Sequence, residues 1–211
     1  MILYATAAGE AESELVIEKS RFIGCVRPVQ GRAEADAFFA ARRALHRAAT
    51  HNVPALVLGE KGELQWASDD GEPQGTSGAP ILRLLVAEGL TNVALMVTRY
   101  FGGVKLGTGG LSRAYAGAAR LTLEAAGVCD VGERALLTYR IDYGLLGKLQ
   151  NLARRGDLFQ IEDTVFGAAV VVTLASPSEN ADALAALVAD ISAGKGELLS
   201  RKTELAALAR R

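Results

Sequence analysis

Residues 135–208 read ALLTYRIDYGLLGKLQNLARRGDLFQIEDTVFGAAVVVTLASPSENADALAALVADISAGKGELLSRKTELAAL, and this stretch determines the fold of the C-terminal part. Strand patterns at 135–143, 157–166, 168–175 and 196–208 are separated by two helical patterns, at 145–156 and 181–194. The resulting order, β-α-β-β-α-β, predicts the split βαβ arrangement of a ferredoxin-like domain.

The preceding residues predict a second, separate set of elements. We expect one or two strands in 13–29, a helix over 31–50, a buried strand at 54–59, a turn at 60–63 into a strand ending at residue 68, a loop over 69–80, a helix over 81–89, a strand over 92–100 and a helix from about 110 to 126. A short linker around 129–132 then divides the chain into domains at 1–130 and 133–211. The whole is predicted to be a two-domain α+β protein.

Composition excludes several classes of protein. Half of the 211 residues are hydrophobic, 22% are charged and only two are cysteines, which argues against disorder and against a disulfide framework. No apolar run reaches the roughly 18–20 residues that span a bilayer. The first twenty residues carry five Glu or Lys and lack a basic segment followed by an apolar block, so we expect no targeting peptide. These features predict a cytoplasmic protein without a membrane partner.

Charge is unevenly distributed although the net charge is only −1. Residues 89–123 contain no Asp or Glu but include Arg99, Lys105, Arg113 and Arg120, whereas Asp69, Asp70 and Glu72 cluster just upstream. Since the whole chain has no surplus of cations, any contact with nucleic acid must come from this local basic segment.

Glycine is dense between residues 71 and 110, and two interpretations remain open. GGVKLGTGG at 102–110 leads into a helix, whose first N–H groups, with Lys105 and Arg113, suit an anion. Alternatively, the glycines only turn the chain and let elements pack closely. The spacing matches neither the dinucleotide fingerprint nor the Walker A motif, so we expect neither nucleotide site and no cofactor.

The polar residues of 69–80 allow three roles. The three acids suit Mg²⁺, ordinary turn hydrogen bonds or pairing with Arg99 or Lys105, and we favour the turn over a metal. Ser77 in GTSGA approximates a nucleophile elbow, but both histidines precede it, which is the wrong order for such a triad, so a helix cap is favoured.

Three aromatic residues are ambiguous at this stage. Tyr100 and Phe101 end a strand beside the basic segment, and Trp66 lies on a predicted hairpin strand. If exposed, such rings stack on bases or anchor a protein partner, and if buried they belong to the core.

The segments DDGEPQGTSGAPIL (69–82) and NVALMVTRYFGGVKLGTGGLSRAY (92–115) together resemble the YigZ/IMPACT family. SRFIG at 20–24 and the pair His51-Asn52 also match, and the C-terminal pattern fits the bacterial two-domain form. The family usually has Cys after His-Asn, whereas Val53 follows here, so no thiol role is expected at that position.

The resemblance implies a fold and a broad role. It implies an N-terminal domain like domain two of ribosomal protein S-five, and a C-terminal ferredoxin-like domain similar to one in elongation factor G. Eukaryotic relatives of the IMPACT type regulate translation during amino-acid starvation by competing for a kinase activator. They use an extra N-terminal module for partner binding, and we expect no such module in this chain.

We therefore expect a non-enzymatic binding protein associated with translation, whose partner is RNA or a ribosome-associated protein. The alternatives are a hydrolase or phosphoryl-handling enzyme that uses the acidic and glycine-rich loops, and an interaction module whose glycines are purely structural. Acidic side chains that form turn hydrogen bonds would favour the binding protein. A concave pocket lined by both the acids and Lys105 and Arg113 would favour the enzyme. The candidate binding surface comprises His51, Asn52, Asp69, Asp70, Glu72, Gly75, Thr76, Arg99, Tyr100, Phe101, Gly102, Gly103, Lys105, Gly107, Gly109, Gly110 and Arg113.

Overall fold

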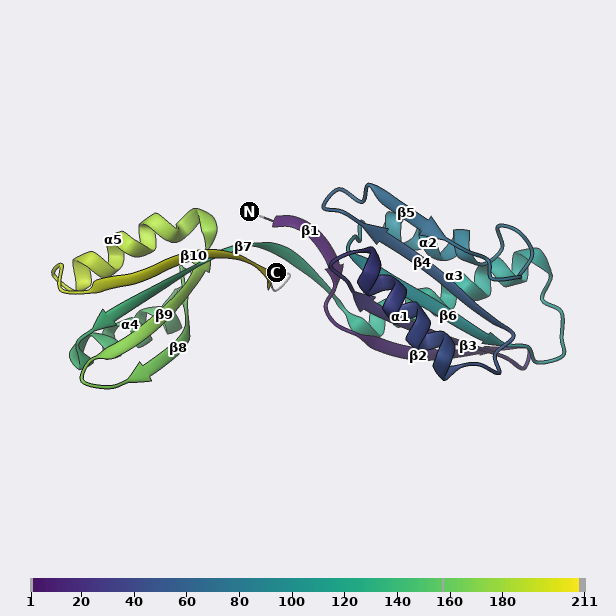
Figure 1. The fold of residues 1–211 in the computed structure, drawn as a ribbon, viewed down its shortest axis with the longest axis horizontal. Coiled ribbons are helices and arrows are strands. Elements are labelled where there is room, and N and C mark those ends of the chain that lie inside the picture. Colours follow the sequence, from purple (N-terminus) through teal and green to yellow (C-terminus); the bar gives the residue numbers. More distant parts are fainter. Residues whose placement is uncertain (1, 157, 209–211) are drawn as a thin grey trace. The chain divides into compact units, whose positions relative to one another are not determined.

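The computed structural model describes residues 2–156 and 158–208 (Figure 1). Residue 157, predicted to begin a strand, lies outside the described residues, as do residues 1 and 209–211 of the expected domain ranges. The chain forms two compact units, one at Tyr4–Asp130 and one that includes Val131–Leu208.

The first unit is built on a five-stranded sheet. Its strands are β2 (Ala11–Ile17), β3 (Ser20–Pro28), β4 (His51–Leu58), β5 (Leu64–Ala67) and β6 (Val93–Tyr100). They lie in the order β2-β3-β6-β4-β5, and every neighbouring pair is antiparallel. The last of them in the sequence, β6, is therefore the central strand.

Helices cover both faces of this sheet (Figure 1). Val93, Leu95 and Val97 of β6 pack in the cluster that contains α2 (Gly78–Ala87) and α3 (Gly107–Ala126). The alternate residues Ala94 and Met96 join the cluster of α1 (Arg32–Leu45). Because a strand's side chains alternate between faces, β6 is buried on both sides, which explains its continuous apolar sequence.

The second unit confirms the predicted ferredoxin-like order. It contains β7 (Val128–Ile141), α4 (Tyr143–Arg155), β8 (Gln160–Phe166), β9 (Val170–Pro177), a short 3₁₀ turn at Ser178–Asn180, α5 (Ala181–Ile191) and β10 (Glu197–Leu208). β7 pairs with β10 and with β9, and β9 pairs with β8. Both helices pack on one apolar cluster that includes Leu137, Leu149, Leu174 and Leu184.

Several boundaries differ from the prediction. A first strand, β1 (Ile2–Ala7), pairs with β7 and was not predicted. The expected linker at 129–132 lies inside β7, so it is a strand rather than a loop. Helix α1 ends at Leu45 rather than at Thr50, because the backbone N–H of Thr50 donates to the Arg99 carbonyl (2.8 Å) and leads the chain into β4. Helix α3 begins three residues before Gly110.

Candidate functional site

Asp69 organises the loop that precedes α2. One carboxylate oxygen accepts from the backbone N–H of Gly75 (2.7 Å), and the other accepts from Ser77 N (3.1 Å), Ser77 Oγ (2.8 Å) and Gly78 N (2.9 Å). Burial alone would raise the pKa of Asp69, but these four hydrogen bonds outweigh it and lower the pKa. Ser77 precedes the first residue of α2, as a cap would, yet the cap is supplied by Asp69. With its hydroxyl fully buried and bonded, Ser77 is no nucleophile.

Glu72 joins the two glycine-rich segments. Its side chain is 3% exposed, and one oxygen accepts from Arg99 NH1 (2.7 Å) and from the Tyr115 hydroxyl (2.7 Å). The other oxygen lies 3.8 Å from Nε2 of His51. Burial, followed by the hydrogen bond to Glu72, raises the pKa of Tyr115 far above its usual range, so the phenol stays protonated. The expected pairing of the acids is confirmed for Arg99.

Asp70 is also used within the protein. Its carboxylate accepts from Asn52 N (2.6 Å), and its carbonyl accepts from Nδ1 of His51 (2.8 Å), which fixes the proton on that nitrogen. The Asn52 side chain in turn accepts from the Thr98 hydroxyl (2.8 Å). Within the described ranges, no three His, Cys, Asp or Glu residues are grouped to hold a metal ion.

The aromatic residues have different fates. Tyr100 is half-buried, and its hydroxyl lies 3.0 Å from Nδ1 of His46. Trp66 packs against Phe39, with the ring centroids 6.3 Å apart. Phe101, by contrast, is 47% exposed. Of these rings, Phe101 is the one available to a partner.

The predicted basic segment is smaller than its sequence indicates. Arg99 is buried beneath the loop, and Arg120 pairs with Glu88 (3.1 Å). Lys105 and Arg113 are exposed, and neither forms an ion pair with a described residue. Arg113 lies over the first turn of α3, because a Cβ on Gly109 would be 3.5 Å from its NH1. Two exposed cations therefore remain in the segment.

The remaining candidates are largely structural. Thr76 is buried, and its hydroxyl donates to the Pro73 carbonyl (2.6 Å). Gly102 passes so close to the turn before β3 that a Cβ would overlap the Lys19 carbonyl group. Positive φ angles occur at Gly75 (75°), Gly103 (89°) and Gly107 (69°), which favours glycine there. A Cβ on Gly110 would lie 3.0 Å from the Cβ of Leu106. No side chain of the described residues caps the N-terminus of α3.

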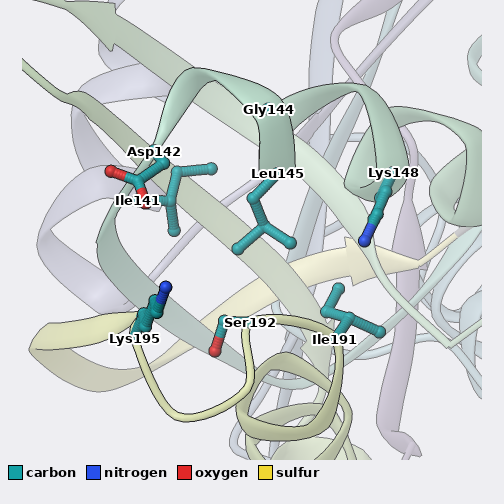
Figure 2. Close-up of a pocket in the computed structure, with 9 residues that line it drawn as sticks. Ile141, Asp142, Gly144, Leu145, Lys148, Ile191, Ser192 and Lys195 are labelled. Atoms are coloured by element: carbon teal, nitrogen blue, oxygen red, sulfur yellow. The ribbon is translucent and has the colours of Figure 1, made fainter.

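A cavity of about 190 Å³ lies in the second unit and is lined by none of these residues (Figure 2). Figure 2 shows Lys148 and Lys195 on opposite sides of Leu145 in its lining. Both lysines are exposed, and the buried Ser192 already donates to the Ala189 carbonyl (3.2 Å). The lining thus presents no buried polar group that waits for a ligand.

Comparison with known proteins identifies the family. The model of the Impact N-terminal domain matches residues 18–123. IMPACT family member YvyE of Bacillus subtilis is 36% identical over 92% of this chain and 89% of its own length. The chain belongs to the IMPACT family. The IMPACT family member YigZ of Escherichia coli is 34% identical over 87% of the chain and 91% of its own length.

The second unit and the overall chain also have matches. Residues 140–195 match a domain of unknown function, DUF1949. A crystal structure of a hypothetical protein, 32% identical, superposes with a TM-score of 0.60 and covers 95% of this chain and 98% of that one. The two-domain translational regulator Yih1 gives a TM-score of 0.36 at 24% identity, over 57% of this chain and 45% of that one, which is too distant to carry an argument. The IMPACT family and the α+β prediction are both confirmed.

Three contributors to the site were not predicted. Tyr115 lies two turns inside α3, and nothing in its spacing indicates that its hydroxyl reaches Glu72. Ser20 accepts from the backbone N–H of Gly102 (3.1 Å), and Lys19 lies against the same glycine. The two contacts with Gly102 join residues about eighty positions apart, so only the sheet order reveals them.

Proposed function

We propose that this IMPACT family member is a non-enzymatic binding protein that acts around translation in the cytoplasm. Its partner is RNA, and it binds through a surface made of the 101–106 loop and Arg113. The family resemblance supplies the link to translation, because eukaryotic relatives of this type regulate that process. The geometry of the first unit supplies the reason for binding rather than catalysis.

The observation that carries the proposal is the fate of the three acids. Asp69, Asp70 and Glu72 all point into internal hydrogen bonds or ion pairs. In contrast, Phe101 is 47% exposed, and Lys105 and Arg113 are exposed and form no ion pair with a described residue. Because the acids are engaged inside the protein, their negative charge does not neutralise the surface formed by the aromatic ring and the two cations. This composition suits a polyanion that also presents flat, apolar groups.

The enzyme hypothesis requires carboxylates in an open cleft. The acidic carboxylates here are used to hold the loops, and Ser77 is sealed in the same network. The cavity described above is lined by residues of the second unit and includes none of the three acids, Lys105 or Arg113. We therefore retain the binding function and set the enzyme aside.

A titration with labelled single-stranded and double-stranded RNA at about 50 and 200 mM salt tests the proposal. The variant Lys105→Ala/Arg113→Ala removes the two exposed cations. Each phosphate contact on single-stranded nucleic acid contributes about 0.7 to the slope of log K against log salt. We expect the double variant to lower that slope by up to about 1.4.

A matched control removes equal charge elsewhere. Lys148→Ala/Lys195→Ala also deletes two exposed cations that form no ion pair with a described residue, but these lie in the second unit. It should leave the affinity and the salt slope close to those of the wild type. No RNA binding by the wild type at low salt would refute the proposal, and co-sedimentation with ribosomes would then test a protein partner. Equal losses in both double variants would show only a general charge effect.

A further inference from the structure

Phe101 is an exposed ring supported from beneath by a fixed cation. The guanidinium carbon of Arg99 lies 5.4 Å from the centroid of the Phe101 ring. Arg99 is itself held by Glu72 (2.7 Å) and is 5% exposed. Hence part of the ring rests on a buried, immobile group while 47% of the residue faces solvent. An exposed ring with this support resembles a stacking surface more than a displaced core residue.

The backbone around this ring is held from both sides of β6, at the starts of β4 and β3. The N–H of Phe101 donates to Oγ1 of Thr50 (3.0 Å), just before β4. The N–H of Gly102 donates to Oγ of Ser20 (3.1 Å), at the start of β3. Gly102 also packs against the Lys19 carbonyl so closely that no side chain fits there. The backbone that carries the ring is thus held before any partner arrives, which lowers the entropy lost on binding.

Two lysines lie in the segments next to the ring. Lys19 occupies the β2–β3 turn that touches Gly102, and Lys105 follows Phe101 in the same loop. Both are exposed and make no ion pair with a described residue, and Glu18 is the acid that shares the turn with Lys19. Lys19 lies outside the basic segment visible in the sequence, and the fold brings it to the loop. The surface therefore combines one aromatic face with cations from two segments.

We propose that Phe101 is a stacking platform for a base of single-stranded RNA, with Lys19 and Lys105 contacting the adjacent phosphates. This inference rests on the proposed function and names its partner class and its central contact. Stacking tolerates every base, so the platform predicts binding with little sequence preference. A duplex keeps its bases stacked inside, so double-stranded RNA should bind more weakly than a single strand of equal length.

The test pairs variants of the protein with variants of the RNA. Labelled oligouridine of about 12 nucleotides is titrated against the wild type, Phe101→Leu, Phe101→Tyr and Lys19→Ala. Phe101→Leu keeps an apolar side chain but removes the π-face, whereas Phe101→Tyr keeps both. An oligomer of the same length with abasic positions removes the stacking bases from the RNA instead.

We expect Phe101→Leu to weaken binding of oligouridine by about tenfold with an unchanged salt slope, and Phe101→Tyr to bind like the wild type. On the abasic oligomer, Phe101→Leu and the wild type should bind equally. Lys19→Ala should lower the salt slope by about 0.7. Unfolding midpoints followed by Trp66 fluorescence check that each variant folds.

Three outcomes would overturn the inference in distinguishable ways. RNA binding that falls with Lys105→Ala/Arg113→Ala but is unaffected by Phe101→Leu would refute the platform and keep the proposed function. Loss of binding in Phe101→Leu on uridine and abasic RNA alike would show a structural effect rather than stacking. Absence of RNA binding by the wild type would refute both proposals together.

Discussion

The buried ion pair between Glu72 and Arg99 allows a quantitative prediction. Glu72→Gln keeps the shape of the side chain but removes the charge that compensates Arg99. The guanidinium would then keep a neutral amide oxygen in place of the carboxylate, together with Ser20 Oγ at 3.4 Å and the faces of two phenylalanine rings. Its Nε already has no hydrogen-bond partner in the part of the chain that the structure describes. The substitution therefore leaves a buried, poorly compensated cation.

The expected magnitude follows from this geometry. Removing one partner of a buried pair usually costs about 3–5 kcal/mol, because the other charge stays desolvated. Since glutamine still offers a neutral acceptor to Arg99 and Tyr115, we expect the lower end, about 3 kcal/mol. The companion variant Arg99→Met removes the stranded charge. In the double variant the two changes should therefore destabilise less than their sum, with a coupling of about 2 kcal/mol.

Urea unfolding followed by tryptophan fluorescence measures these values. Trp66 is the only tryptophan in the sequence and lies on β5, packed against α1 of the same unit. For a slope of about 1–3 kcal/mol per molar urea, Glu72→Gln should lower the midpoint by roughly 1–3 M. A midpoint within experimental error of the wild type would refute the reasoning. So would a coupling near zero, because it would mean that the two side chains do not depend on one another.

Three further predictions concern single positions. Gly102→Ala should destabilise the first unit by about 1–3 kcal/mol, because its Cβ would overlap the neighbouring turn. Gly109→Ala, in the first turn of α3, should stabilise the unit by up to about 1 kcal/mol. Equal urea midpoints for the two variants would contradict this prediction. Hydrogen bonds lower the pKa of Asp69 in the folded protein, so ionised Asp69 contributes to stability at pH values above 3.8, the ordinary pKa of the group. This contribution is lost as the pH falls through the lowered pKa of the folded state. In Asp69→Asn, urea unfolding measured over the same pH range should lack this part of the acid dependence. Burial and then the charge of Arg42 lower the pKa of His46, so the free energy of unfolding should fall as the pH drops below 6.5. An NMR titration should show a higher pKa for His46 in Arg42→Met than in the wild type.

Much of the fold is written in local patterns. The order of elements in the second unit follows from sequence periodicity, because β7, β9, α4 and α5 each turn buried residues toward one apolar cluster. β1 escaped prediction because it is a six-residue strand near the end of the chain, with no partner nearby in the sequence. The end of α1 escaped because an alanine-rich segment has no stop signal, and a long-range hydrogen bond from Thr50 ends the helical path.

The site was less predictable than the fold, and Arg99 shows why. Its neighbours in sequence suggested an exposed basic segment, yet it points inward to Glu72. On a strand that alternates polar and apolar residues, the position of Arg99 in the alternation would have indicated which face of the sheet its side chain occupies. β6 is buried on both faces, so it offers no alternation to read. The aromatic platform likewise depends on contacts to Ser20 and Thr50, which no spacing rule connects to Phe101.

The order of strands in the first unit has a consequence for how the protein is made. β2 and β3 pair as one hairpin and β4 and β5 as another, but these two hairpins are not neighbours in the sheet. β6 lies between them and is synthesised last of the five. A nascent chain that ends before residue 93 would hold two separate hairpins, each of which is marginal in water. Folding of this unit, and with it the surface around Phe101, therefore waits until β6 has left the ribosome and joined the two halves.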